Sequence, residues 1–355
     1  MSKPPISPYS DQPAHAFWRS AVVERQPQTL AALHQPKFEL TPDTPILTAG
    51  SCFAQHLHRT LTQLNWRVIT KEAAPNGMSK RIAERYAFGQ YSARYGNIYT
   101  ARQWVELIQE AVSDAPASPI VWSKDGRFFD ALRPSVEPKG LLHPDEVAQA
   151  RTAHLAAVRH ALAEAECVIF TLGLTEAWVD QSTGRTLPTA PGTVAGTLAD
   201  APVSFVNFGY ADVLEDVKQA RQMLRDINPA MRMLLTVSPV PLTATATSAH
   251  VVQASTVSKS VLRAAADSIV TEFDDVDYFP SYEIITTPVL GGPFFDSNLR
   301  SPTKQGVDHV MKVFVDSYTD TQSDHGLQPQ APAPADPMEL WDAQCEDLLL
   351  DAFSK

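Results

Sequence analysis

Two side chains that could act as nucleophiles, Ser51 and Cys52, are adjacent in the sequence. They follow the apolar run TPILTAG at 44–50 and precede a segment with apolar residues at helical spacing, so we expect a strand, a tight turn and a helix. A helix N-terminus lowers the pKa of a nearby thiol, which favours Cys52 for attack on an acyl group. Alternatively, Ser51 is a helix cap and Cys52 a small buried residue.

Two more apolar runs end in residues that could face the same site. The run CVIFTLG at 167–173 continues into Leu174-Thr175-Glu176, and MRMLLTVSP at 231–239 continues into Val240-Pro241. A helical pattern precedes each run, and this alternation predicts a parallel sheet with helices on both faces. Ligands bind beyond the carboxyl ends of such strands, so we expect the three turns to meet.

The rest of the chain divides by composition. Residues 1–40 are Pro-rich and predict an N-terminal arm, whereas 41–320 carry the alternating pattern of one domain. Within that domain, residues 75–140 predict a long insertion with helices that walls one side of the site. Residues 321–337 have a Pro-rich linker composition. Residues 338–355 predict an amphipathic helix that could dock on its own domain or on a partner protein.

Charge and cysteine content exclude several classes of function. A formal charge of -11 and a pI near 5.4 argue against binding to nucleic acid or to an anionic membrane surface. The three cysteines, Cys52, Cys167 and Cys345, are far apart and have no zinc-site spacing, which indicates reduced thiols in the cytoplasm. The N-terminus lacks the apolar run of a signal peptide, and no stretch approaches the roughly 20 apolar residues of a membrane span. We expect a cytoplasmic protein without a metal or another cofactor.

Four strings of the chain resemble the GSCFA family, which is distantly similar to the SGNH/GDSL acyl hydrolases. They are TAGSCFAQHLHRTL, TLGLTEAWVD, TVSPVPLTAT and GVDHVMKVF, in the order expected for that family. The resemblance implies an α/β fold: a three-layer α/β/α sandwich with a central parallel sheet, similar to flavodoxin, and a nucleophile after the first strand. Gly50-Ser51-Cys52 matches the Gly-Asp-Ser of the GDSL pattern, so Cys52 takes the place of the nucleophilic serine.

The resemblance also implies groups that hold an oxyanion. SGNH enzymes use a glycine and an asparagine-bearing turn, and here Thr175 stands where that asparagine would be. A glycine and an asparagine in the loop RYGNIYT could supply further donors. Thr175 could equally be a helix cap, and the loop an ordinary turn. The predicted oxyanion and substrate contacts are Gly50, Asn97, Gly173, Thr175 and Glu176.

The general base is less evident in the sequence. SGNH enzymes place Asp and His three residues apart near the C-terminus, but the corresponding Asp296-Ser-Asn-Leu299 ends without histidine. His309 follows at the start of the last helical pattern, and histidine suits proton transfer near neutral pH. Asp296 could orient it, although a packing role for His309 fits as well. Other side chains that could serve as a base or bind a substrate anion are His56, His58, His250, Lys259 and Arg300.

Two functions fit this pattern. The first is hydrolysis or transfer of an ester, with an O-acetyl group on a carbohydrate as the expected substrate, and the aromatic, arginine-containing segment 86–104 would suit stacking on sugar rings or simple packing. The second is a non-catalytic carbohydrate-binding or scaffold protein on a decayed hydrolase fold, which the missing Asp-x-x-His favours. A metal hydrolase fits poorly, because no His-x-x-x-His with an acidic partner and no carboxylate cluster has ligand spacing.

Overall fold

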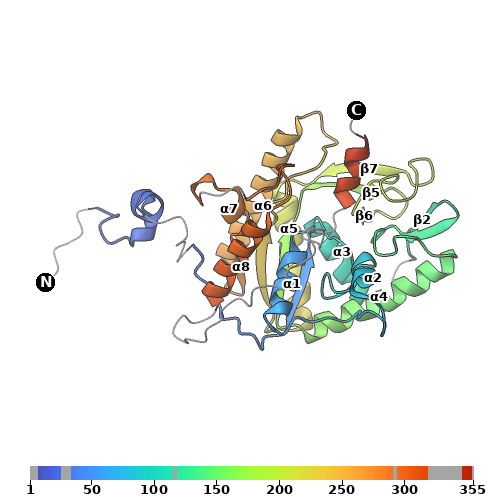
Figure 1. The fold of residues 1–355 in the computed structure, drawn as a ribbon, viewed down its shortest axis with the longest axis horizontal. Coiled ribbons are helices and arrows are strands. Elements are labelled where there is room, and N and C mark those ends of the chain that lie inside the picture. The colour runs from blue at the N-terminus through green and yellow to red at the C-terminus, as the bar shows by residue number, and fades with distance from the viewer. Residues whose placement is uncertain (1–6, 25–32, 115–117, 291–293, 319–345, 354–355) are drawn as a thin grey trace.

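A parallel sheet forms the centre of the molecule (Figure 1). The computed structural model describes residues 7–24, 33–114, 118–290, 294–318 and 346–353. Within them the sheet order is β1-β4-β8-β9, and each pair of neighbours is parallel. The strands are β1 (Ile46–Gly50), β4 (Cys167–Leu172), β8 (Arg232–Val237) and β9 (Val276–Tyr278). The predicted parallel sheet is confirmed.

Helices cover both faces of this sheet because alternate strand residues are apolar on each side. Leu47, Phe170 and Leu235 belong to one core cluster, and Ile46, Ile169 and Leu234 to the other. The first cluster lies under α3 (Ala101–Val112), α4 (Pro144–Glu164), α5 (Tyr210–Ile227) and α6 (Val251–Glu272). The second lies under α1 (Ala54–Gln63), α7 (Ser281–Thr286) and α8 (Lys304–Tyr318). The chain is therefore the predicted three-layer α/β/α sandwich.

The segment predicted as a helical insertion is mixed in structure. It holds α2 (Lys80–Arg85), α3 and an antiparallel hairpin of β2 (Val121–Lys124) and β3 (Arg127–Asp130). Its aromatic side chains are core residues: Tyr91, Tyr95, Tyr99 and Trp104 are each at most 3% exposed, and the Trp104 ring stacks on Phe170 of β4 at 5.4 Å. These rings therefore pack inside the domain and do not form a sugar-stacking surface.

A second sheet was not predicted from the sequence. It is antiparallel, in the order β6-β5-β7, and consists of β5 (Glu176–Asp180), β6 (Thr186–Leu187) and β7 (Val203–Asn207). Only one short alternation of apolar and polar residues, EAWVD, marks β5 in the sequence. This sheet extends the carboxyl edge of the central sheet beyond β4.

The described residues cover part of the predicted arm and part of the predicted C-terminal helix. The described part of 1–40 holds a 3-10 turn, Ala14–Ala16, and a π-helical turn, Arg19–Val23. The predicted linker 321–337 and Cys345 lie outside the described residues. Within the predicted C-terminal helix, Glu346–Phe353 forms a 3-10 helix, η4, drawn red beside β5 and β7 in Figure 1.

Candidate active site

The three strand ends meet at one small cavity, as the sequence predicts. Ser51 and Cys52 follow β1, Gly173 follows β4 and Ser238 follows β8, and all four line it. The cavity has a volume of about 10 Å³, close to that needed for one water molecule. Its full lining is Ser51, Cys52, Tyr99, Gly173, Leu174, Ser238, Val240, Pro241, Leu242 and Arg300. An ester therefore needs more room than this closed arrangement offers.

Two glycines allow the turns to approach so closely. Gly50 has φ 129°, and a Cβ there would lie 2.4 Å from the carbonyl oxygen of Thr171 in β4. A Cβ on Gly173 would lie 2.8 Å from Cβ of Ser51. The N–H groups of Gly173 and Leu174 both donate to the Tyr99 carbonyl, at 3.0 and 3.1 Å. Gly173 therefore allows the turn after β4 to pack closely against Ser51, and its N–H already donates to Tyr99.

The adjacent Ser51 and Cys52 are both buried, at 2% and 3% exposure. The Ser51 hydroxyl has no hydrogen-bond partner among the described residues. The Ser51 carbonyl accepts the N–H of Ala54, the first residue of α1, at 2.8 Å, so the turn leads directly into the helix as predicted. Burial, and next the charge of Cys52, raise the pKa of Tyr91 well above its ordinary value, which places the thiol near a hydroxyl that stays protonated.

A polar cluster connects this turn to Asn97. The Tyr91 hydroxyl lies 3.1 Å from the Ser51 carbonyl oxygen and 2.5 Å from Oδ1 of Asn97. Gln55 Nε2 donates to the same Oδ1 at 3.1 Å. Because two donors face Oδ1, the amide nitrogen of Asn97 must point the other way. Asn97 is thus a predicted site residue that the structure brings next to the turn of Ser51 and Cys52.

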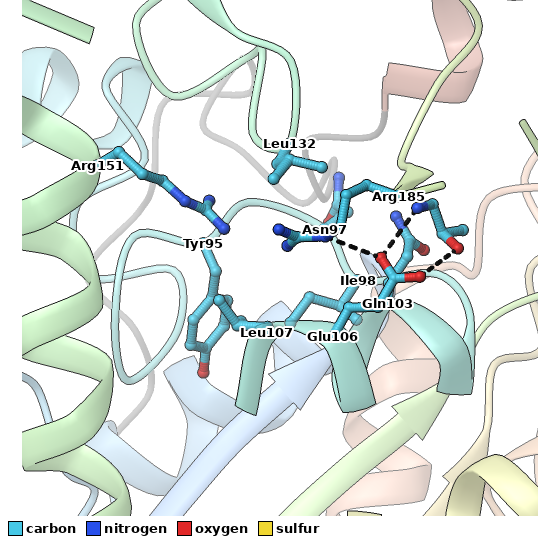
Figure 2. Close-up of a pocket in the computed structure, with 10 residues that line it drawn as sticks. Tyr95, Asn97, Ile98, Gln103, Glu106, Leu107, Leu132, Arg151 and Arg185 are labelled. Carbon is cyan, nitrogen blue, oxygen red and sulfur yellow. Dashed lines mark hydrogen bonds and ion pairs between the residues drawn. The ribbon is translucent and has the colours of Figure 1, made fainter. Parts of the chain in front are cut away.

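Ion pairs stabilise the wall behind Asn97. Figure 2 shows Asn97 and Gln103 at one side of a cavity of about 20 Å³, which Arg151 and Arg185 enter from opposite sides. Arg185 lies 3.4 Å from Glu106 and 2.6 Å from Glu110. Burial would raise the pKa of Glu110, but Arg151 and Arg185 outweigh it and hold that pKa below its usual range. These contacts tie α3 to the small sheet and fix the segment that carries Asn97.

Thr175 and Glu176 have structural partners away from the cavity. The Thr175 hydroxyl donates to Oδ1 of Asn207 in β7 at 2.7 Å. The Glu176 carboxylate accepts the Thr245 hydroxyl at 2.6 Å and the Ala246 N–H at 2.9 Å. Neither residue lines the cavity with Cys52. The structure therefore does not bring these two side chains to the cavity, because Asn207 of the second sheet accepts from Thr175 and the loop after β8 donates to Glu176.

His309 and Asp296 are not brought to the cavity either. The His309 ring stacks on Phe294 at 5.7 Å, and its Nε2 has no partner among the described residues. Burial and the charge of Lys312 lower its pKa. His309 is only half-buried, on the flank of α8, and the buried residues of this helix are Gly306, Val307, Val310, Met311, Phe314 and Tyr318. Asp296 is exposed, so the described residues do not form the predicted unit of Cys52, His309 and Asp296.

The competing histidines also have structural roles. The His56 ring packs against Phe53 at 5.6 Å, and His58 Nδ1 lies 2.8 Å from the Thr48 hydroxyl. Burial, with a smaller effect of Arg59, lowers the pKa of both histidines to about 4. His250 caps α6, since its Nδ1 accepts a backbone N–H. None of the three lines the cavity.

Two larger cavities adjoin the small one. A cavity of about 540 Å³ shares Pro241, Leu242 and Arg300 with it and is also lined by Lys259, whose Nζ donates to the Gly173 carbonyl at 2.6 Å. A second, of about 230 Å³, shares Leu174 and Leu242. The cysteine turn therefore lies where two grooves meet.

Four residues of this region were not predicted from the sequence. Tyr91 contacts Asn97, and Tyr99 lines the cavity. Glu346 accepts hydrogen bonds from Asn97, Tyr99 and Ser135. Tyr99 stands two residues after Asn97 in the same loop, which was the one available signal. Ser135 and Glu346 are far along the chain from Cys52 and carry no motif. In the described ranges, no three His, Cys, Asp or Glu side chains are grouped so as to hold a metal ion. Across the same ranges, no helix has the length and apolar content to cross a membrane.

A family 3 carbohydrate esterase of Clostridium thermocellum is similar in structure with a TM-score of 0.33 and 8% identity, covering 77% of this chain and 94% of that chain. An acetyl xylan esterase from the rumen bacterium Butyrivibrio proteoclasticus gives a TM-score of 0.29 and 11% identity, covering 79% and 64%. No curated protein sequence matches the chain significantly. Residues 45–314 match the GSCFA family, and the chain belongs to that family.

Proposed function

We propose that the protein transfers an acyl group from an ester, with Cys52 as the nucleophile, and that its substrate is an O-acetylated carbohydrate. One observation carries the proposal: Cys52 lies in the turn between β1 and α1, where the ends of three parallel strands meet around a cavity. This is the edge at which open parallel sheets bind their ligands. The thiolate would attack the ester carbonyl, form a thioester and release an alcohol that takes a proton from solvent; water or a second hydroxyl would then accept the acyl group and restore the thiol.

The residues that line the cavity favour the thiol over the neighbouring hydroxyl. Among the ten residues that line the cavity, none is a histidine, aspartate or glutamate. A serine needs an adjacent base to become nucleophilic, whereas a cysteine has an appreciable thiolate fraction near neutral pH. Cys52 also lies two residues before the first residue of α1, and helix dipoles favour negative charge at such N-termini. Cys52 is thus a better candidate than Ser51.

The adjoining large cavity supports a polar, drug-sized substrate. Its volume of about 540 Å³ lies within the range of small-molecule sites. Polar side chains contribute to its wall, among them Thr243, Ser255, Asn298 and Arg300. Hydroxyl, amide and guanidinium groups of this kind can donate to sugar hydroxyls and carbonyl oxygens. A carbohydrate bound there would present its acetyl group across Pro241 and Leu242 towards Cys52.

A non-catalytic binding protein is the alternative that a specific observation favours. The described residues that line the cavity of Cys52 include no histidine, aspartate or glutamate, and this cavity has room for about one water molecule. A decayed hydrolase would keep the large cavity and bind a glycan in it without chemistry. Binding without turnover would identify this case.

The test is release of acetate from p-nitrophenyl acetate and from cellobiose octaacetate. We expect Cys52→Ala to lower the rate to the uncatalysed level, since it removes the acyl acceptor. Ser51→Ala should keep at least half of the activity. The matched thiol control is Cys167→Ala: Cys167 is fully buried in β4, and burial raises its pKa to about 12, so its loss should not affect turnover per folded molecule. Full activity of folded Cys52→Ala would refute the proposal.

A further inference from the structure

The C-terminal 3-10 helix places a carboxylate next to the candidate active site. Glu346, the first residue of η4, is only 5% exposed although it lies near the end of the chain. Asn97 Nδ2 and the Tyr99 hydroxyl both donate to its Oε2, the latter at 2.8 Å, and the Ser135 hydroxyl donates to its Oε1. Three donors from the insertion therefore surround one carboxylate.

These donors form a built site with a defined orientation. Asn97 and Tyr99 are 5% and 3% exposed, and the Asn97 amide is held by Gln55 and Tyr91 so that its nitrogen faces Glu346. Gly96, with φ 71°, lets the loop turn at this point. Amide and hydroxyl donors that were arranged before the ligand arrives bind a carboxylate at a lower entropic cost.

The carboxylate site is continuous with the cysteine cavity. Tyr99 lines the cavity with Ser51 and Cys52, and its hydroxyl donates to Glu346. The Tyr91 hydroxyl contacts both the Ser51 carbonyl and Asn97. Next to burial and Cys52, the charge of Glu346 also contributes to the raised pKa of Tyr91. Glu346 thus lies close to the nucleophile turn and belongs to the same polar cluster.

The second anchor of η4 is apolar. Leu350 lines the cavity of about 230 Å³ together with Trp178, Phe205 and Leu242. Leu349 and Phe353 point away from it, at 47% and 66% exposure. η4 therefore contacts the domain at two points, one polar at Glu346 and one apolar at Leu350.

We propose that Asn97, Tyr99 and Ser135 form a carboxylate-binding subsite beside Cys52, and that the C-terminal segment is its intramolecular ligand, which a substrate or effector carboxylate must displace. Within the described residues no Lys or Arg pairs with Glu346, so only neutral donors hold its carboxylate. We therefore expect Glu346 to leave the subsite reversibly. Hydrogen bonds from neutral donors are weaker than ion-paired, bidentate ones. The contacts above support the subsite by themselves. Only the statement that displacement of the C-terminal segment controls the reaction at Cys52 rests on the proposed function.

The test measures alkylation of Cys52 by iodoacetamide in the full-length protein, quantified by peptide mass spectrometry. We expect Glu346→Ala to increase the alkylation rate at least about tenfold, because it removes the ionised acceptor of three hydrogen bonds. Phe353→Ala, in the same helix but exposed, should stay within about twofold of the wild type, as surface changes usually do. The N-acetylated peptide EDLLLDAFSK should slow alkylation of Glu346→Ala, and the same peptide with glutamine in first place should not.

Hydrogen exchange separates this inference from the function of Cys52. In Glu346→Ala, the amides of 346–353 should exchange faster than in the wild type, whether or not the thiol reacts. If Cys52 resists alkylation in every variant while this exchange accelerates, the carboxylate subsite stands and the nucleophile proposal fails. Unchanged exchange of 346–353 together with no effect of the peptide would overturn the inference.

Discussion

Replacing Gly50 with alanine should destabilise the protein far more than the same change at Gly77. Both glycines have positive φ, and left-handed backbone costs an L-residue about 1–2 kcal/mol. At Gly77 nothing lies within 4 Å of the new Cβ, so this cost is the whole effect. At Gly50 the Cβ would meet backbone atoms of Thr171 at 2.4, 2.6 and 2.9 Å, and backbone cannot rotate away.

The extra cost at Gly50 follows from what must move. Separating β1 from β4 adds an overpacking cost of about 1–3 kcal/mol. It also strains the Ser51 N–H to Thr171 bond and the Ile98 N–H to Gly50 bond, each worth about 0.5–1.5 kcal/mol. The total is about 3–8 kcal/mol for Gly50→Ala against about 1–2 kcal/mol for Gly77→Ala. Urea unfolding followed by tryptophan fluorescence measures both values, and a difference below about 1 kcal/mol would refute this account of the turn.

Three further predictions concern groups around the site. His56 and His58 have pKa values of about 4 in the folded protein, below the unfolded value of 6.5, so they contribute stability above pH 6.5 that is lost as the pH falls towards 4. The free energy of unfolding should drop by about 2 kcal/mol per imidazole from pH 7 to pH 5, and a urea midpoint that does not change with pH would contradict this. Arg151→Met removes one of the two arginines that pair with the buried Glu110 and leaves Arg185 as its remaining partner. Because a buried carboxylate then loses part of its compensating charge, the free energy of unfolding, measured in urea, should fall by about 3–5 kcal/mol. His309→Ala should leave acetate release within about twofold of the wild type because the ring lies outside the cysteine cavity, and a hundredfold loss would restore His309 as the base.

The order of strands and helices in the central sandwich could be predicted from the sequence, for a simple physical reason. Strands and helices of a sandwich are marked by runs and periodicities of apolar residues, and these are local properties of the chain. The turns after Gly50, Leu172 and Val237 could be placed together because parallel strands share one carboxyl edge. Cys52 was therefore predictable as a cavity residue.

The partners of the side chains were not predictable in the same way. Thr175 was expected near the oxyanion, but its hydroxyl is used by Asn207 in a sheet that only one short alternation announces. His309 was expected near Cys52 from its position along the chain, yet the rotation of α8 turns it onto Phe294. Glu346 carries no motif, and its contact with Asn97 joins residues 249 positions apart. Such contacts depend on packing between distant elements, which a single sequence does not encode locally.

The most direct test of the central claim is to trap the acyl-enzyme. The wild-type protein and Cys52→Ala would be mixed with p-nitrophenyl acetate, quenched in acid within the first turnover and digested for mass spectrometry. We predict one acetyl group on the peptide that contains Cys52, released by hydroxylamine as expected of a thioester, and no acetylated peptide in Cys52→Ala. An acetyl group on Ser51, or acetate release without any modification of this turn, would contradict the claim that Cys52 is the nucleophile.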